Sequence, residues 1–366
     1  MPEKKKKSKS ALKVNKGIEQ PSSINEDAVK KFSSKKITEF TTSDIVTGIL
    51  SGNRTMLSKA ITLVESTLPA HHDLAQDVIE KCLPYSGKSI RIGITGVPGV
   101  GKSTFIEALG TLLIKREKKV AVLTIDPSSA RSKGSILGDK TRMENLANNK
   151  NAFVRPSASA GSLGGVARKT HESIILCEAA GFNTIFVETV GVGQSETAVH
   201  SLVDFFLLLM LAGAGDELQG IKRGIIEMAD AIVINKADDD NIIKAGLAKQ
   251  NYENALHLFP PTNSSWIPLV KTCSSISGDG IKEVWEIIEN YVEQTYENNY
   301  FENNRKNQSV TIMLDTINMR LNDSFYFNDK IEESLHRIKN DLKTNKISAY
   351  VAAQNLLDKY FKELKK

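Results

Sequence analysis

The sequence has few cysteines and no long apolar run. Its six histidines are scattered and its cysteines lack C-x-x-C spacing, so we expect neither a disulfide framework nor a His/Cys metal centre. The three cysteines are Cys82, Cys177 and Cys273. The longest apolar run, residues 205–214, is about half as long as a membrane span and is typical of a buried parallel strand. We therefore expect a protein of the reducing cytoplasm with no membrane segment.

Net positive charge is confined to one terminal segment. Residues 1–16 contain seven lysines and one glutamate, so the remaining residues carry −1 of the overall formal charge of +5. A basic nucleic-acid-binding face is therefore not expected. Residues 1–25 are rich in lysine and serine and poor in large apolar side chains, which predicts a disordered tail without the apolar core of a signal peptide.

Residues 96–104, GVPGVGKST, fit the phosphate-loop pattern G-x-x-x-x-G-K-[ST]. The pattern stands between an apolar run and a helical pattern, which is the strand–turn–helix context that such a loop needs. Its glycines let backbone N–H groups surround a phosphate, while Lys102 reaches the β- and γ-phosphate oxygens and Ser103 ligates Mg²⁺. The predicted phosphate-binding residues are Gly99, Val100, Gly101, Lys102, Ser103 and Thr104.

A second motif, Asn235-Lys236-Ala237-Asp238, directly follows the apolar residues 231–234. An aspartate carboxylate can accept two hydrogen bonds from the N1–H and N2–H₂ donors of guanine, a donor pair that adenine lacks. We expect Asp238 to read the base, Asn235 to bond the other purine edge and the loop, and Lys236 to lie over the ring. The motif therefore predicts GTP over ATP.

Three polar, glycine-containing segments lie between these motifs, each after a predicted strand. The first, residues 126–142, offers the carboxylates Asp126 and Asp139 as Mg²⁺ ligands, directly or through water. The second, residues 188–196, begins with the acidic Glu188, and the third is residues 213–223. Any one of them could be a solvated loop, but their order between two nucleotide motifs predicts a role near the γ-phosphate.

Apolar runs alternate with helical patterns from residue 89 onward, which predicts a doubly wound, mainly parallel α/β sheet. The predicted strands are residues 91–95, 120–125, 152–155, 184–187, 205–211, 231–234 and 266–270. We expect a nucleotide-binding domain over residues 89–297, closed by a helix at 280–297, and an N-terminal helical segment within 26–88.

The C-terminal residues 298–366 are predicted to begin with a polar linker, 298–308, and to continue as amphipathic helices. Their apolar faces are residues 331, 335, 338 and 342 and residues 347, 351, 357 and 361. One interpretation is an appendage packed on its own domain. The other, which the second apolar face favours, is an arm that forms a homodimer.

The sequence resembles the MeaB/ArgK-type P-loop GTPases. The segments that carry this resemblance are GVPGVGKST, DPSS, GSILGDKTRM, ETVGVGQSE, GDELQGIK and NKAD. These proteins are G-protein chaperones of adenosylcobalamin-dependent methylmalonyl-CoA mutase, once described as kinases of an arginine/ornithine transport system. The resemblance is strong over residues 43–297. It implies that Asp126, Asp139 and Glu188 surround Mg²⁺, and that a switch responding to the mutase occupies residues 215–222.

GTP hydrolysis depends on positioning and on charge neutralisation, with Mg²⁺ bridging the β and γ oxygens. Analogy to Ras selects Gln194 to orient water, although its spacing from Gly191 differs, and Lys222 could add positive charge when a partner orders its loop. The expected function is a GTPase that gates cofactor loading and repair of the mutase. A small-molecule kinase of a transport system and a nickel-inserting GTPase are the alternatives, and the sequence lacks the His/Cys cluster that the second needs.

Overall fold

The computed structural model describes residues 40–125, 142–157, 163–189, 195–213, 223–260 and 262–364. The chain divides into two compact units, Met1–Thr41 and Thr42–Lys366. The elements described below belong to the second unit. The predicted tail, residues 1–25, lies outside the described residues.

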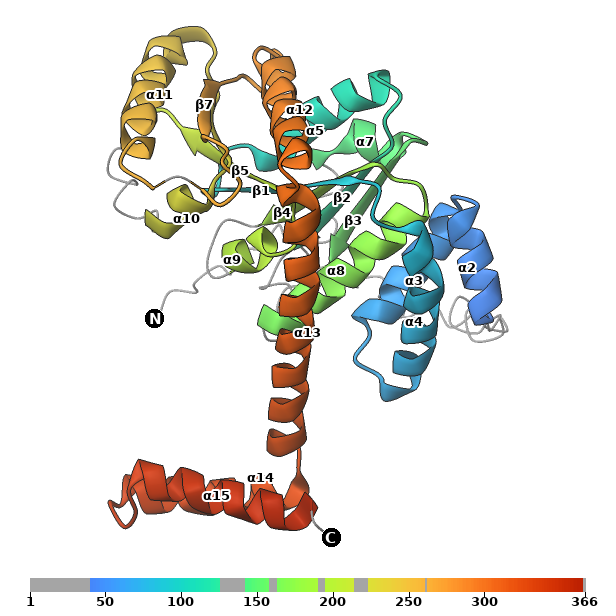
Figure 1. Cartoon of the computed structure of the whole chain (residues 1–366), viewed down its shortest axis with the longest axis vertical. Helices are drawn as coiled ribbons and strands as arrows, with labels where there is room; N and C mark the ends of the chain where they lie inside the picture. The colour runs from blue at the N-terminus through green and yellow to red at the C-terminus, as the bar shows by residue number, and fades with distance from the viewer. Residues whose placement is uncertain are drawn as a thin grey trace, which may run out of the picture. The chain divides into compact units, whose positions relative to one another are not determined.

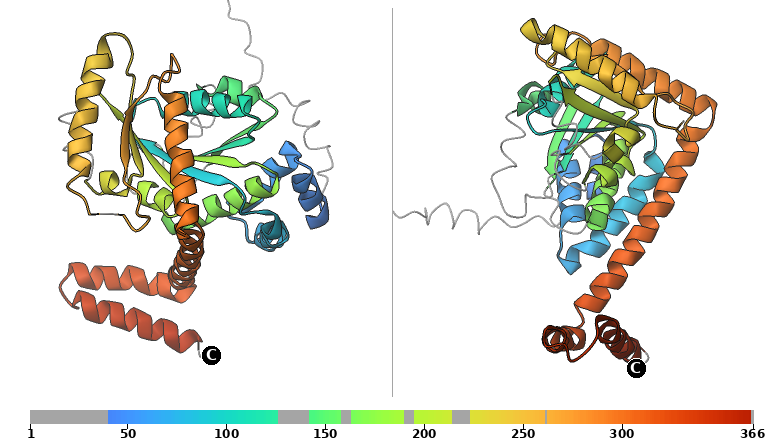
Figure 2. Two further views of the ribbon diagram at one scale, coloured as in Figure 1. Left: turned by 45° about the horizontal axis from the view of Figure 1, so that its top comes forward. Right: turned by 90° about the vertical axis from the view of Figure 1, so that its left-hand side faces the viewer.

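A sheet of parallel strands forms the centre of this unit, in the order β3-β2-β4-β1-β5-β6-β7 (Figure 1). Every residue of β2 and β4 is buried, because helices cover both faces of the sheet (Figure 2). The strands are β1 (Ile90–Gly96), β2 (Val120–Ile125), β3 (Ala152–Ser157), β4 (Thr184–Thr189), β5 (Phe205–Leu211), β6 (Ala231–Asn235) and β7 (Leu269–Thr272). The predicted doubly wound fold is therefore confirmed. Strand order reverses around β1, and a ligand of such a sheet binds at the carboxyl ends of the strands beside this reversal.

One strand is shifted from its predicted place, residues 266–270. The apolar character of Trp266 serves packing instead of strand pairing, since its indole N–H donates to the Asp230 carbonyl at 2.9 Å. The preceding Ser265 has a positive φ of 59°, which turns the chain before β7 begins at Leu269.

Two groups of helices cover the sheet. One core contains the apolar sides of α5 (Lys102–Lys115), α7 (Glu144–Asn148) and α12 (Ile281–Glu297), packed on β1, β2 and β5. A second core lies under α10 (Arg223–Met228) and α11 (Ile242–Leu256), against β5, β6 and β7. Helices α8 (Leu163–Ala179) and α9 (Ser195–His200) complete this second layer, and short 3₁₀ turns occupy Leu83–Tyr85 and Asp239–Asn241.

The predicted N-terminal helical segment consists of α2 (Thr42–Leu50), α3 (Arg54–Glu65) and α4 (Pro69–Cys82), and α3 and α4 contact α8. The breaks follow local chemistry. Gly52 has a positive φ of 75°, and the Asn53 side chain then caps α3 by accepting the N–H groups of Thr55 and Met56. One predicted helical region is therefore three helices.

The predicted linker, residues 298–308, is wrong. Asn299 adopts a left-handed φ of 62°, and α13 (Tyr300–Tyr326) begins directly after it. The first turns of α13 are held by specific contacts: Phe301 stacks on Tyr296 with ring centroids 4.2 Å apart, and Arg305 pairs with Asp204 at 2.7 Å. These contacts use polar and aromatic side chains at single positions, so they leave no apolar periodicity in the sequence.

Beyond α13 the chain forms a hairpin of α14 (Asp329–Lys343) and α15 (Ala349–Leu364), which lie side by side (Figure 1). Its small core contains Ile331, Leu356 and Tyr360, and Ser324 of α13 is 2.6 Å from the Tyr360 hydroxyl. Among the described residues no helix has both the length and the apolar character that a membrane crossing requires.

Candidate nucleotide-binding site

The loop between β1 and α5 has the tight backbone that its glycines predict. Gly96 has a φ of 149°, and a Cβ there would lie 2.3 Å from the Leu209 carbonyl oxygen on β5. Gly101 has a φ of 94°, and a Cβ there would lie 2.9 Å from Nδ2 of Asn235. Both positions therefore require glycine, and the loop is held against the strands beside it.

Lys102 is buried in this loop at 8% exposure. Its ammonium donates to the carbonyl oxygens of Gly96, at 2.8 Å, and Val97, at 3.3 Å. Burial lowers the pKa of Lys102, while the negative charges of Glu188 and Glu196 act in the opposite direction. The loop thus holds a cation at the start of α5, where the helix N-terminus also favours an anion.

Ser103 and Glu188 meet although they are far apart in sequence. The Ser103 hydroxyl donates to Oε1 of Glu188 at 3.0 Å, and Glu188 is buried at 7% exposure. The β1–β4 register places Glu188 beside Ile94, just before the loop. A hydroxyl and a carboxylate at this spacing are oxygen ligands that fit Mg²⁺, which prefers oxygen and retains water. The other two predicted ligands, Asp126 and Asp139, lie outside the described residues.

These groups line a cavity of about 620 Å³, within the size range of small-molecule sites. The cavity wall also includes Thr124, which was not predicted, and Arg142 and Thr189, which were predicted only as members of the first and second segments near the γ-phosphate. The Thr189 hydroxyl donates to the Thr95 hydroxyl at 2.9 Å, which joins the ends of β4 and β1. Arg142 adds a cation to the phosphate side of the cavity.

Asn235 connects the phosphate loop to the base-reading region. It is 1% exposed, and its Nδ2 donates to the Val100 carbonyl at 2.9 Å. Its Oδ1 accepts the backbone N–H and the hydroxyl of Ser275, at 3.2 and 2.8 Å, and the Cys273 thiol at 3.4 Å. The predicted bond to the loop is present. Because protein groups occupy both ends of this amide, Asn235 acts first as a structural clamp.

Asp238 lies at the open end of the same motif and is half-buried. Its Oδ2 accepts the Ser274 hydroxyl at 2.5 Å, and Lys236 has a positive φ of 58°. Ser274 and Ser275 were not predicted as site residues, although they follow a short apolar strand at the same sheet edge. The carboxyl ends of β6 and β7 therefore place the Asp238 carboxylate beside the Ser274 hydroxyl, and a carboxylate is able to accept paired N–H donors.

The structure thus brings together Lys102, Ser103 and Glu188 at one end of the site and Asn235 and Asp238 at the other. Gln194 and Lys222, which were predicted to act in hydrolysis together with Lys102, lie outside the described residues, as does the proposed third switch at 215–222. The strands β2, β4 and β5, which precede the three switch segments in the sequence, end at the sheet edge that carries the phosphate loop.

Comparison with known proteins agrees with this geometry. The family described as "Methylmalonyl Co-A mutase-associated GTPase MeaB" matches residues 57–330. GTPase ArgK of Escherichia coli is 47% identical over 274 residues, which are 75% of this chain and 83% of that protein. The mouse protein named "Methylmalonic aciduria type A homolog, mitochondrial" is 42% identical over 323 residues, covering 86% of this chain and 78% of the relative.

A solved structure titled "LAO/AO transport system kinase" superposes with a TM-score of 0.71 at 36% identity, covering 88% of this chain and 99% of that one. Fold, phosphate loop and sequence similarity agree over most of the chain. The protein belongs to the MeaB family of P-loop GTPases.

Proposed function

We propose that this protein binds and hydrolyses GTP with Mg²⁺, and that it acts as a chaperone gating cofactor loading of an adenosylcobalamin-dependent methylmalonyl-CoA mutase. The observation that supports the nucleotide part is the contact between the phosphate loop and the Asn235–Asp238 motif, in which Asn235 donates to the Val100 carbonyl and Asp238 accepts the Ser274 hydroxyl. The partner is suggested by the family description and by the name of the mouse relative. The buried free cysteines Cys82, Cys177 and Cys273 fit a reducing compartment, for which we propose the cytoplasm.

The residues have distinct tasks in this proposal. Lys102 would leave the carbonyls of Gly96 and Val97 and bind the β and γ oxygens, which are stronger acceptors because they are charged. Ser103 and Glu188 would hold Mg²⁺, and the metal would neutralise charge between the β- and γ-phosphates. Asp126 and Asp139 would complete its surroundings. Gln194 and Lys222 remain proposals for orienting water and for stabilising charge when the mutase binds.

The base-reading assignment has a direct test. Asp238→Ala should weaken GDP binding on the order of 100-fold, because two charge-assisted hydrogen bonds are lost. Asp240→Ala, an exposed carboxylate of the same loop, is the matched control and should bind GDP like the unchanged protein. Calorimetric titration with GDP and ADP measures both. The assignment would be contradicted if the Asp238→Ala variant bound GDP as tightly as the unchanged protein does, or if the unchanged protein bound ADP as tightly as GDP.

We also propose a homodimer formed by the C-terminal arm. Beyond its first turns α13 exposes an apolar stripe at helical spacing, and α15 exposes a second one. The α13 stripe consists of Val310, Met313, Leu314, Ile317 and Leu321, and the α15 stripe of Tyr350, Val351, Leu357, Phe361 and Leu364. Exposed apolar stripes of this kind are typical of interaction surfaces, and a second copy offers the same stripe for a symmetric contact.

A kinase of a transport system remains the second candidate, because the superposed structure carries that title. Transfer of the GTP γ-phosphate to a free amino acid or a protein would favour it. A metal-inserting GTPase has less support, since the described residues contain no group of three or more His, Cys, Asp or Glu side chains able to hold a metal.

A further inference from the structure

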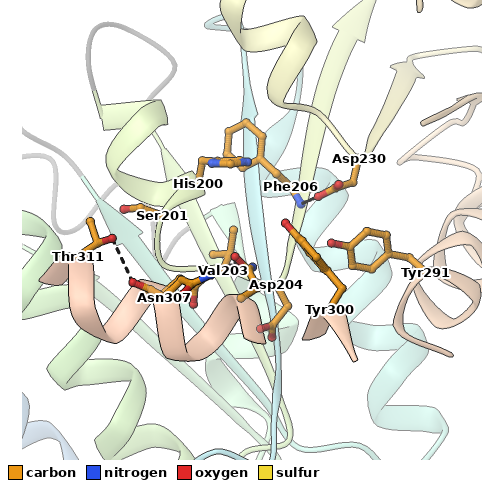
Figure 3. Close-up of a pocket in the computed structure, with 12 residues that line it drawn as sticks. His200, Ser201, Val203, Asp204, Phe206, Asp230, Tyr291, Tyr300, Asn307 and Thr311 are labelled. Atoms are coloured by element: carbon orange, nitrogen blue, oxygen red, sulfur yellow. Dashed lines mark hydrogen bonds between the residues drawn. The ribbon is translucent and has the colours of Figure 1, made fainter. Parts of the chain in front are cut away.

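A second cavity, of about 190 Å³, lies at the sheet edge opposite the phosphate loop (Figure 3). Asp204 directly precedes β5 and Asp230 directly precedes β6, whereas the nucleotide motifs follow the carboxyl ends of the strands. Helices α9, α12 and α13 supply the other walls. This volume is more than ten times the ~15 Å³ that one water molecule needs. The nucleotide site does not use this space.

The acidic and basic side chains that line this cavity directly are unequal in number. Among its lining residues there are two aspartates and neither lysine nor arginine. Asp204 is already paired, since Arg305 donates to it at 2.7 and 2.8 Å. His200 is a weak source of charge because burial lowers its pKa. The remaining carboxylate, Asp230, therefore sets the electrostatic character of the cavity.

Asp230 accepts the Phe206 backbone N–H at 2.8 Å. Burial raises the pKa of Asp230 to about 7, and that hydrogen bond offsets only part of the effect. No lysine or arginine of the described part of the chain forms an ion pair with it. A positive ligand would supply the counter-charge that the protein does not.

Gln308 provides an observation independent of Asp230, a buried amide oxygen that lacks a hydrogen-bond donor. It is 6% exposed, and its Nε2 donates to the Val203 carbonyl at 2.7 Å, which fixes the orientation of the amide. Its Oε1 is buried and has no hydrogen-bond partner among the described residues. Buried amide oxygens are rarely left without a donor. Gln308 lines the cavity, so a rotation of its side chain would bring this oxygen within reach of a ligand with N–H groups.

Aromatic rings form much of the remaining wall. Tyr291 of α12 and Tyr300 of α13 stand beside Asp230, and Phe206 meets His200 edge-on at 5.4 Å (Figure 3). The Asp230 charge contributes to raising the pKa of both tyrosines, although burial is the larger cause. The faces of such rings attract cations. The cavity therefore combines a carboxylate, an amide acceptor and ring faces.

We propose that this cavity is a binding site for a small organic cation with several N–H donors, a primary ammonium or a guanidinium. The ligand places its charge against Asp230 and donates to Gln308, and its alkyl part contacts Tyr291 and Tyr300. An anion finds no cation in the wall. Because Tyr300, Gln308 and Thr311 belong to α13, an occupied cavity also fastens this helix to the nucleotide domain.

Calorimetry and ligand-observed NMR on the full chain with GDP bound provide the test. The probes are methylguanidinium chloride and ethylammonium chloride, with methylurea as the neutral isostere and sodium chloride as the ionic-strength control. The proposal requires saturable binding of at least one cation, with methylurea weaker by about tenfold or more. Absence of saturable cation binding up to about 10 mM, or equal binding of methylurea, overturns it.

Matched variants locate the binding. Asp230→Asn removes the charge and keeps an acceptor for the Phe206 N–H, and Asn304→Lys places a fixed ammonium at the wall. Each should weaken cation binding about tenfold or more, while Asn303→Lys, the exposed neighbour outside the lining, should not. Unchanged GDP affinity shows that a variant is folded. If Asp230→Asn fails this check, Asn304→Lys decides, and unchanged cation affinity in a folded variant overturns the site.

Discussion

Replacing Asn235 with alanine should destabilise the nucleotide-free protein by at least about 3 kcal/mol. The change removes three hydrogen bonds between 2.8 and 3.2 Å, each contributing about 1 kcal/mol net. It also leaves the Val100 carbonyl and the Ser275 N–H buried without these partners, which adds a desolvation cost of about 1–3 kcal/mol for each group that water cannot reach. Such a loss is a large share of the ~5–15 kcal/mol that stabilises a typical domain.

Urea unfolding without nucleotide measures this effect, with the fluorescence of the buried Trp266 and Trp285 as the signal. Asn241→Ala is the matched control, since Asn241 makes one exposed hydrogen bond to the Lys236 carbonyl, and it should cost less than about 1 kcal/mol. Asn235→Asp should be as harmful as Asn235→Ala, because its second oxygen cannot donate to Val100. An Asn235→Ala protein as stable as the Asn241→Ala protein would refute the clamp.

Two further predictions concern pH and assembly. Burial, aided by the Arg91 charge, lowers the pKa of His171 to about 4 from 6.5. As pH falls, His171 therefore takes up a proton in the unfolded chain before it does so in the folded protein. The free energy of unfolding should drop by up to about 3 kcal/mol between pH 6.5 and 4. In urea titrations the free energy of unfolding of the His171→Gln variant should depend less on pH. A variant with the same pH dependence as the unchanged protein would contradict this role of His171. In light scattering, Leu321→Glu should convert a dimer to a monomer while the adjacent Asn322→Glu should not; a monomeric starting protein, or a Leu321→Glu dimer, would exclude the α13 stripe as the contact.

Much of the fold was predictable because its strands are continuous apolar runs and its motifs carry their own chemistry. The phosphate loop and the Asn235–Asp238 motif have fixed spacing, so the sequence locates both. The sequence could not show that Asn235 forms hydrogen bonds with Val100 and Ser275, because these contacts depend on the strand order, in which β1 and β6 lie on either side of β5. The sequence also indicated a linker where α13 begins, since Arg305 and Gln308 are isolated polar residues whose hydrogen bonds to the domain leave no apolar periodicity.

The cavity beside Asp230 was equally hidden from sequence analysis. Its walls come from separate segments, and none carries a motif. Asp204 and Asp230 each precede a strand, where an aspartate is commonly a solvated loop residue. The docking of α13 over the sheet edge supplies one wall of the space above them.

The central claim is that GTP hydrolysis by this protein is coupled to a mutase. The most direct measurement is the rate of phosphate release from GTP with Mg²⁺, with and without purified adenosylcobalamin-dependent methylmalonyl-CoA mutase. The account predicts slow release by the protein alone and a faster rate that saturates with mutase concentration. A rate that the mutase leaves unchanged, together with no complex between the two proteins in either nucleotide state, would contradict it.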